Sequence, residues 1–579
     1  MRERLLTQHF LQRFLENDLL SPDADRHDAI AMVCGVLLTL GLFLSVMMSM
    51  KFLFMPFQSP GRTALLALGD RLTFSAIAMV VMALVAVMAW DALSLDPRDT
   101  AIFGTLPIHR AVIVRAKLRA IGLMAGGFAL AISSLSSLFH PALMVVKLPV
   151  GVLLAVALVA IHLTVMLAAS LFAFASVFAL REAARALLGS RFARISAALQ
   201  AVLIVGLVTI FLLLPAILNR AGRPEQRAAR MLPPVWFVGL HDVLAGDAVA
   251  DLPRGRMPPS VASEEDRDAA RYRALARSIR PLAWRAVAGL GISLSVAIGG
   301  FFWNARRLPL PVVGRRTGRY RGPGLLARAM ALTALRHPAT QAGFYFTLHC
   351  LFRSGPHRVV IAACTAVSTA LAVVLLATAS RVTGGVWSIP VSVLATQPMV
   401  MSIMVAGFRH VTRVPADIRA NRMFRLAWVA DSSRFVAGVR RGAFTGVVLP
   451  AVVLLLPAHL YLIGLRPAAM HGVCGLLVGA ALVSILTFRT SRLPFVAGYA
   501  PASDLNTIGP VVLVGGPIAV ALFAQIERVA LAGLWAGVVL CGILTAIVLL
   551  PAMADHNEDL DLPTAFDAPP AGATRLDLD

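Results

Sequence analysis

The sequence predicts an all-α polytopic membrane protein with about twelve transmembrane helices in two six-helix repeats, and with both ends in the cytoplasm. Hydrophobic residues make up 58% of the chain, charged residues make up 14%, and the mean hydropathy is +0.79. A soluble protein could not hide so much apolar surface, so lipid must form part of its solvent. Two further observations support this class: basic residues gather in alternate loops, and one loop pattern recurs half a chain apart.

The apolar runs predict the individual spans, since a helix needs about 20 apolar residues to cross a bilayer. The run at 149–180 is long enough to continue into the cytoplasm as a helix. The predicted spans lie near 29–55, 72–92, 119–139, 149–180, 196–218, 284–304, 359–380, 386–408, 443–464, 470–488, 508–525 and 529–552.

The distribution of Lys and Arg predicts the orientation of these spans. The loops assigned to the cytoplasm hold several times as many basic residues as the short outer loops, as the positive-inside rule requires. The loop 219–283 is too long for the rule to apply. The resulting domains are a cytoplasmic interfacial helix (1–28), a first six-helix half (29–304) with an extracytoplasmic loop (219–283), a basic cytoplasmic connector (305–358), a second six-helix half (359–552) and an acidic disordered tail (553–579).

The N-terminal segment has the pattern of an amphipathic helix lying in the membrane interface. Leu6, Phe10 and Phe14 recur at helical spacing, with Arg2 and Arg13 among the polar residues between them. A short soluble helix packed on a loop is the alternative. In the connector, the stretches 325–335 and 344–352 could repeat this helix for the second half.

Charge and cysteine usage exclude two other classes of function. The formal net charge is +23, but the basic residues are spread among the loops and form no single soluble face, so we expect no nucleic-acid partner. The five cysteines have no metal-ligand spacing and lie in or near apolar runs. We interpret them as small apolar packing residues and expect no metal site.

A short pattern, D-x-R-x4-F, occurs between the second and third predicted spans of each half. A short helix in each loop would carry the Arg and the Phe on adjoining faces, where a cytoplasmic partner could contact both. An ordinary solvated loop is the alternative. The residues concerned, with the basic residue that follows each motif, are Asp96, Arg98, Phe103 and Arg110 in the first half, and Asp417, Arg419, Phe424 and Arg434 in the second.

The stretches around these motifs, 95–108 and 413–425, resemble the ABC-2 type exporter permeases, including their fused, double-length relatives. The segments 232–240 and 351–358 are similar to parts of the fused permeases. The resemblance implies an interfacial helix, six spans and a coupling helix between the second and third spans in each half. The sequence departs from the family pattern in one respect: the long predicted outer loop occurs only in the first half.

The resemblance also implies a permease subunit in the bacterial cytoplasmic (inner) membrane, whose partners are ATP-binding cassette ATPase subunits and membrane lipid. ATP would be bound by the partner, and this chain would carry no cofactor. Asp96, Arg98, Asp417 and Arg419 would hold the short coupling helices in place. Phe103 and Phe424 would fill a groove on the ATPase.

The chain itself lacks the residues for ATP hydrolysis. A Walker A loop needs Gly-Lys-Ser/Thr, whose backbone amides and Lys hold the phosphates. The three lysines, Lys51, Lys117 and Lys147, follow Met, Ala and Val. We therefore expect no enzymatic activity in this chain.

The positions of acidic residues count against ion-coupled transport in this interpretation. Asp70 is predicted to lie at a span end and Glu182 beyond one, whereas ion-coupled transporters usually bury carboxylates at mid-membrane. His162 is the one intramembrane titratable candidate, and a hydrogen bond to a neighbouring helix is its simplest role. His241 and Asp242 form a pair with no third partner, so no catalytic role is assigned.

The predicted function is export of an unidentified substrate, with a lipid-like or amphipathic molecule as one candidate because the predicted inner face is apolar. Two alternatives remain. One is an ion-coupled secondary transporter, which is also built from two repeats. The other is a membrane enzyme or assembly factor that uses the loop 219–283.

Overall fold

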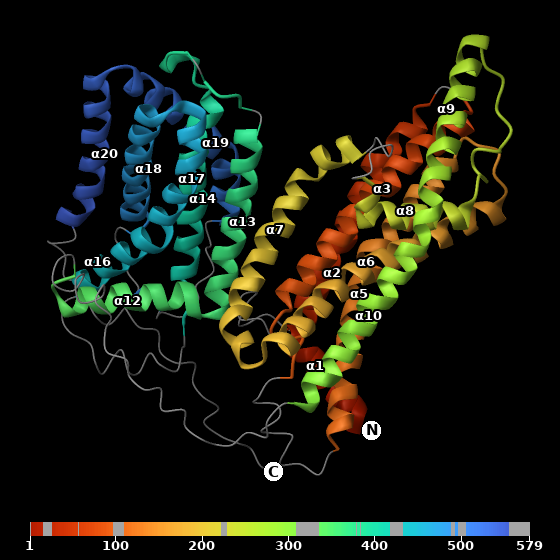
Figure 1. Ribbon diagram of the computed structural model, residues 1–579, viewed down its shortest axis with the longest axis horizontal. Coiled ribbons are helices and arrows are strands. Elements are labelled where there is room, and N and C mark those ends of the chain that lie inside the picture. Colours follow the sequence, from red (N-terminus) through yellow and green to blue (C-terminus); the bar gives the residue numbers. More distant parts are fainter. Residues whose placement is uncertain are drawn as a thin grey trace. The chain divides into compact units, whose positions relative to one another are not determined.

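The computed structural model is built from helices throughout its described residues (Figure 1). By their internal contacts, the residues fall into two compact units, Met1–Arg316 and Thr317–Asp579, which are treated separately below. The structure describes all residues except 1, 16–25, 56, 96–108, 222–228, 308–334, 378, 383, 417–431, 488–492, 496–504 and 555–579.

Unit 1 packs long apolar helices around a shorter one, α8. α2 packs on α5, α3 and α10 pack on α6, and α9 lies along the first part of α3. The helices are α1 (Arg2–Leu15), α2 (Arg26–Leu53), α3 (Pro60–Met88), α5 (Arg110–Val145), α6 (Val152–Leu188), α7 (Phe192–Ala221), α8 (Pro233–Ala245), α9 (Pro259–Ile279) and α10 (Ala283–Arg306).

Unit 2 contains a similar set of apolar helices preceded by a shorter one. Its largest core gathers around α14, with Met401, Val405 and Phe408 almost fully buried. A π-helical stretch, Phe444–Val448, joins α16 to α17 without a break. The helices are α12 (Pro338–Arg353), α13 (Gly355–Ala377), α14 (Val391–Thr412), α16 (Ser432–Ala443), α17 (Leu449–Ile463), α18 (Leu465–Leu486), α19 (Leu505–Ala532) and α20 (Leu534–Ala554).

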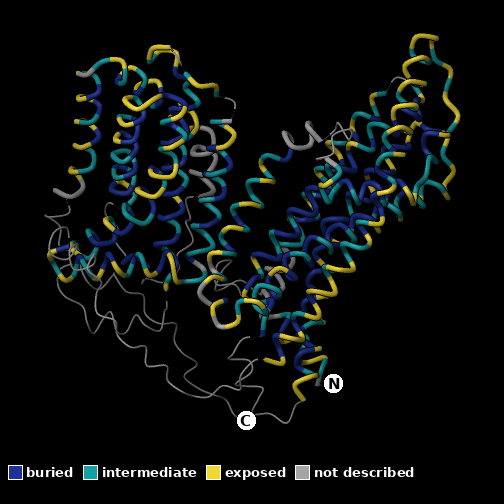
Figure 2. The backbone as a smooth tube through the Cα atoms, viewed as in Figure 1, coloured by how far each residue is buried: buried dark blue, intermediate teal, exposed yellow. Residues whose placement is uncertain are grey.

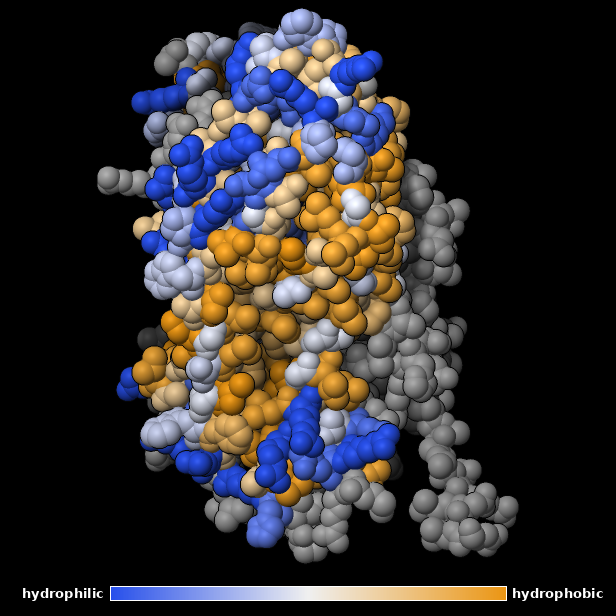
Figure 3. All heavy atoms as spheres, turned by 90° about the vertical axis from the view of Figure 1, so that its right-hand side faces the viewer, coloured by the Kyte–Doolittle hydropathy of each residue, from blue (hydrophilic) through white to orange (hydrophobic). Residues whose placement is uncertain are grey.

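The surface of these helices shows that the protein is a multi-pass membrane protein. Among the described residues, ten helices are long and apolar enough to cross a membrane, and ten of the predicted runs coincide with them. The other two runs overlap with α7 and α20. Within their described residues, the apolar stretches of these helices are shorter than those of the ten. Large apolar side chains such as those of Leu153 and Trp535 are exposed. Exposed residues recur along the helices of both units (Figure 2). On the face of unit 1 seen in Figure 3, an apolar belt separates two hydrophilic ends.

The predicted start of the second span, at residue 72, is wrong. α3 begins at Pro60, a residue whose fixed φ suits the first turn of a helix. The carboxylate of Glu265 in α9 accepts hydrogen bonds from the backbone amides of Gly61 (2.5 Å) and Arg62 (3.2 Å). A side chain distant in sequence therefore satisfies the amides that a helix start leaves free. Because α3 starts early, Asp70 lies within the helix.

The segment 219–283, which the sequence predicts to be an extracytoplasmic loop, contains α8 and α9, and α8 enters the helical bundle. α8 packs against α3, α6 and α10, and Phe237 is fully buried. Close packing requires Gly239, because a Cβ there would lie 2.4 Å from the carbonyl oxygen of Ile279. The residues that follow α8, Gly246 and Asp247, therefore contact α9 and the turn after it.

The predicted amphipathic helices are present in both units. α1 packs against α5, with Leu6 and Phe10 buried. The ammonium of Lys117 in α5 lies 4.8 Å from the centre of the Phe10 ring. In unit 2, α12 covers the stretch predicted at 344–352 and packs against α16. The stretch 325–335 lies outside the described residues except for Leu335.

Candidate functional site

Unit 1 contains a group of ionisable side chains buried where α3, α5, α6 and α8 meet. Each is at most 5% exposed. The expectation that acidic residues avoid the apolar interior is therefore wrong. The members of this buried polar network are Asp70, Arg71, His140, His162, His241 and Asp242.

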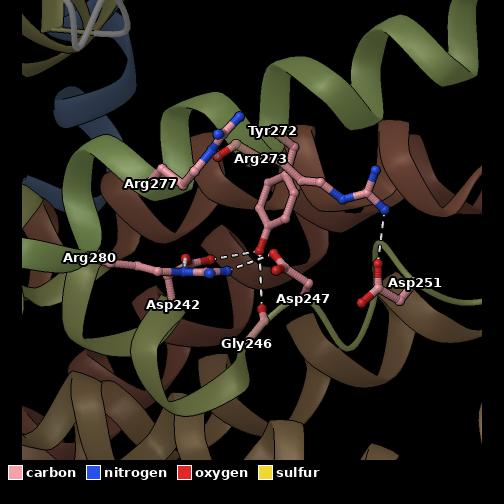
Figure 4. A network of polar contacts seen from close by, with 8 residues as sticks. All are labelled: Asp242, Gly246, Asp247, Asp251, Tyr272, Arg273, Arg277 and Arg280. Carbon is pink, nitrogen blue, oxygen red and sulfur yellow. Dashed lines mark hydrogen bonds and ion pairs between the residues drawn. The ribbon is translucent and has the colours of Figure 1, made fainter.

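Asp242 joins the network to polar groups of α9 and of the turns after α8 and α9, which are drawn with it in Figure 4. Its carboxylate accepts a hydrogen bond from the Tyr272 hydroxyl (2.6 Å) and one from Nε of Arg280 (2.5 Å). Arg280 also donates to Asp247 (2.6 Å), and Tyr272 also contacts the carbonyl oxygen of Gly246 (3.2 Å). The prediction that Asp242 has no third partner is wrong, because partners from α9 and the following turn close over it.

Arg71 supplies a second positive charge beside this carboxylate. It lies close enough to Asp242 and to Tyr272 to interact with both electrostatically. Asp70, the preceding residue, points to another helix and forms an ion pair with Lys51 of α2 (2.5 Å). The Lys51 side chain is 37% exposed, and the second carboxylate oxygen of Asp70 has no hydrogen-bond partner among the described residues. These two adjacent residues therefore connect α3 to both α2 and α9.

Three imidazoles continue the network through the bundle. The ring centres of His140 and His162 lie 5.6 Å apart, and those of His162 and His241 also lie 5.6 Å apart. The centre of the Phe74 ring lies 4.9 Å from that of His140 and 5.7 Å from that of His162. Nδ1 of His140 is hydrogen-bonded to the Ser49 hydroxyl (2.9 Å). His162 is thus not the single intramembrane titratable residue that the sequence predicts.

One nitrogen of each imidazole lacks a hydrogen-bond partner: Nε2 of His140, Nε2 of His162 and Nδ1 of His241. Unpaired buried polar atoms are costly, so this arrangement can bind a water molecule or another small polar group. Among the described residues, no three His, Cys, Asp or Glu side chains are placed to hold a metal ion.

A separate buried pair lies towards the other end of α6. Glu182, predicted to lie beyond its span, is fully buried within α6 and contacts Arg181. The amide of Asn304 in α10 donates to Glu182 (2.7 Å). This contact ties α6 to α10.

Unit 2 contains a comparable group at the junction of α17, α18 and α19. The rings of His459 and His471 lie 4.5 Å apart, and Nδ1 of His471 is hydrogen-bonded to Glu527 (2.7 Å). All three side chains are about 1% exposed. Nε2 of each histidine and the second carboxylate oxygen of Glu527 lack a partner.

The residues predicted to contact an ATPase are mostly not described. Asp96, Arg98, Phe103, Asp417, Arg419 and Phe424 lie outside the described residues. Arg110 is the first residue of α5, and its guanidinium donates to the carbonyl oxygen of Ala305 at the end of α10. Arg434 is exposed on α16.

The fold and the network together define a multi-pass α-helical membrane protein with buried charges in both units. No known protein-family model matches the chain, and neither curated proteins nor solved structures gave a match. The network was missed in the sequence because its members are far apart along the chain. Two adjacent pairs are the local signals: His241 and Asp242, whose partners come from distant segments, and Asp70 and Arg71, whose burial depends on where α3 begins.

Proposed function

We propose that this chain is the permease subunit of an ATP-binding cassette exporter in a bacterial inner membrane, driven by separate ATPase subunits. One observation supports the proposal most directly. In both units, an amphipathic helix packs against the start of the third span: α1 on α5, and α12 on α16. In both units, the loop with the D-x-R-x4-F motif comes just before that contact in the chain.

These helix pairs are suited to receive a force from a cytoplasmic partner, because each is closely packed. In unit 1, Glu3 of α1 forms an ion pair with Arg119 of α5 (2.8 Å). In unit 2, a Cβ on Gly343 or Gly438 would lie 2.2 Å from a backbone oxygen of the opposite helix. Such close contacts between small residues hold helices in one arrangement. A push on either motif loop would therefore move two helices together.

The buried histidines favour a duplicated architecture. His140 and His162 belong to the third and fourth spans of the first half, and His459 and His471 belong to the third and fourth spans of the second. The two rings of each pair lie in contact with each other. Such a recurrence is expected when two halves descend from one unit.

The direct test is purification with a candidate ATP-binding cassette ATPase and measurement of ATP hydrolysis and transport in liposomes. We expect a stable complex whose transport is lost when Phe103 and Phe424 are both changed to Ala, while hydrolysis continues. Phe54→Ala, which removes a Phe that is 74% exposed and distant from the motif loops in sequence, is the matched control. Transport that survives the double change would contradict the assigned roles.

The structure also favours a second candidate, an ion-coupled secondary transporter. Asp70, Asp242 and Glu527 are buried carboxylates, and such groups in membrane proteins commonly bind coupling ions. This removes the argument against ion coupling that the sequence offered. Uptake by the purified chain alone in liposomes, abolished by a protonophore, would establish this alternative and exclude the ATPase-driven one.

A further inference from the structure

A narrow apolar slot opens on unit 1 between α3, α8 and α9. Its volume is about 270 Å³, and nine of its ten lining residues are Leu, Val, Ile or Gly. Leu65 and Leu72 of α3 line one side, and Leu275 and Ile279 of α9 line another. An apolar cavity of about 150 Å³ is enough to bind benzene, so this slot can hold a segment of alkyl chain.

Gly69 leaves part of this slot open. It lines the slot, and no atom lies within 4 Å of the position that its Cβ would occupy. The helix itself does not need glycine here, because Gly69 has an ordinary helical conformation within α3. A side chain at this position would begin at the lining of the slot, with open space around its Cβ.

Arg271 is the one charged residue of the slot. It is exposed and, within the described part of the chain, forms no ion pair. Other arginines of the same segment are engaged: Arg273 pairs with Asp251, and Arg280 pairs with Asp242 and Asp247 (Figure 4). A guanidinium in such a position is suited to bind a phosphate, which it can contact through two hydrogen bonds.

We propose that this slot binds one anionic phospholipid, with an acyl chain against Gly69 and Leu275 and the phosphate against Arg271. The apolar lining and the single cation match the two parts of such a molecule. The site is independent of any ATPase, so its test does not depend on the proposed function.

The test measures retained lipid on purified full-length protein, first exchanged into nanodiscs of phosphatidylcholine and phosphatidylglycerol. After mild detergent extraction, native mass spectrometry counts the lipids bound per chain. We expect one phosphatidylglycerol on the unmodified protein. Gly69→Leu should fill the slot and lower its occupancy about tenfold, whereas Gly122→Leu, at another exposed helical glycine with open space, should not.

Arg271→Gln separates recognition of the head group from burial of the chain. We expect it to weaken phosphatidylglycerol binding about tenfold, the loss typical of a charged hydrogen bond, with little change for phosphatidylcholine. Arg277→Gln, at a neighbouring exposed arginine, is its control. Equal retention of both lipids by the unmodified protein, or no effect of either slot variant, would overturn the proposal. If Gly69→Leu reduces both lipids and Arg271→Gln reduces neither, the anionic assignment is wrong.

Discussion

Asp242→Asn should destabilise unit 1 strongly, because it removes the charge at the centre of the buried network. The Asp242 side chain is 0% exposed and accepts two hydrogen bonds, from Tyr272 and Arg280. Asparagine keeps the size of the side chain but leaves Arg71 and Arg280 without this negative charge. Breaking a buried pair by changing one partner costs about 3–5 kcal/mol. We expect a loss of stability in this range.

Asp251→Asn is the matched control, because it changes another Asp–Arg pair in the same part of unit 1. Asp251 and its partner Arg273 are 61% and 47% exposed. Exposed ion pairs contribute about 0–1 kcal/mol. Tyr272→Phe, which removes one hydrogen bond to Asp242 and keeps the charge, should fall between these two variants, at about 1–3 kcal/mol.

The assay is thermal unfolding of the full chain in detergent, followed by tryptophan fluorescence at a single scan rate. Unfolding of a protein of this size is expected to be irreversible, so the predicted differences in stability are tested by the rank order of the unfolding midpoints. We expect the order Asp242→Asn, Tyr272→Phe, Asp251→Asn, from the largest decrease to the smallest. An Asp242→Asn midpoint equal to that of Asp251→Asn would show that the buried network does not stabilise the fold.

Three further predictions concern a helix cap, a close helix contact and the membrane topology. Glu265→Gln should lower stability by about 1 kcal/mol, because it weakens the cap on the first turn of α3; an unchanged unfolding midpoint would refute this role. Gly438→Ala should cost about 1–3 kcal/mol, since its Cβ would meet a backbone oxygen of α12 at 2.2 Å, whereas Gly35→Ala has open space and should be neutral or stabilising. In a cysteine-free background, Arg254→Cys should react with an impermeant maleimide in intact cells and Arg434→Cys should react only after lysis; the reverse pattern would invert the predicted topology.

The sequence by itself determined the class of protein and most of its helices. A bilayer leaves the backbone no partners except its own, so a long apolar run must become a helix wherever it crosses. The spacing of apolar residues was also sufficient to predict α1, where Leu6 and Phe10 form the buried face, and to predict α12. These features depend on neighbouring residues only, which is why they could be predicted.

Only the tertiary structure decided the start of α3 and the members of the buried network. Glu265 lies about 200 residues from the amides that it caps, and Asp242 meets Arg71 from a segment that the sequence placed outside the bundle. Apolar runs specify that helices form, but they do not specify which helices become neighbours. The partners of a buried charge follow from that choice, since each charge is stable only beside the particular side chain that the packing brings to it.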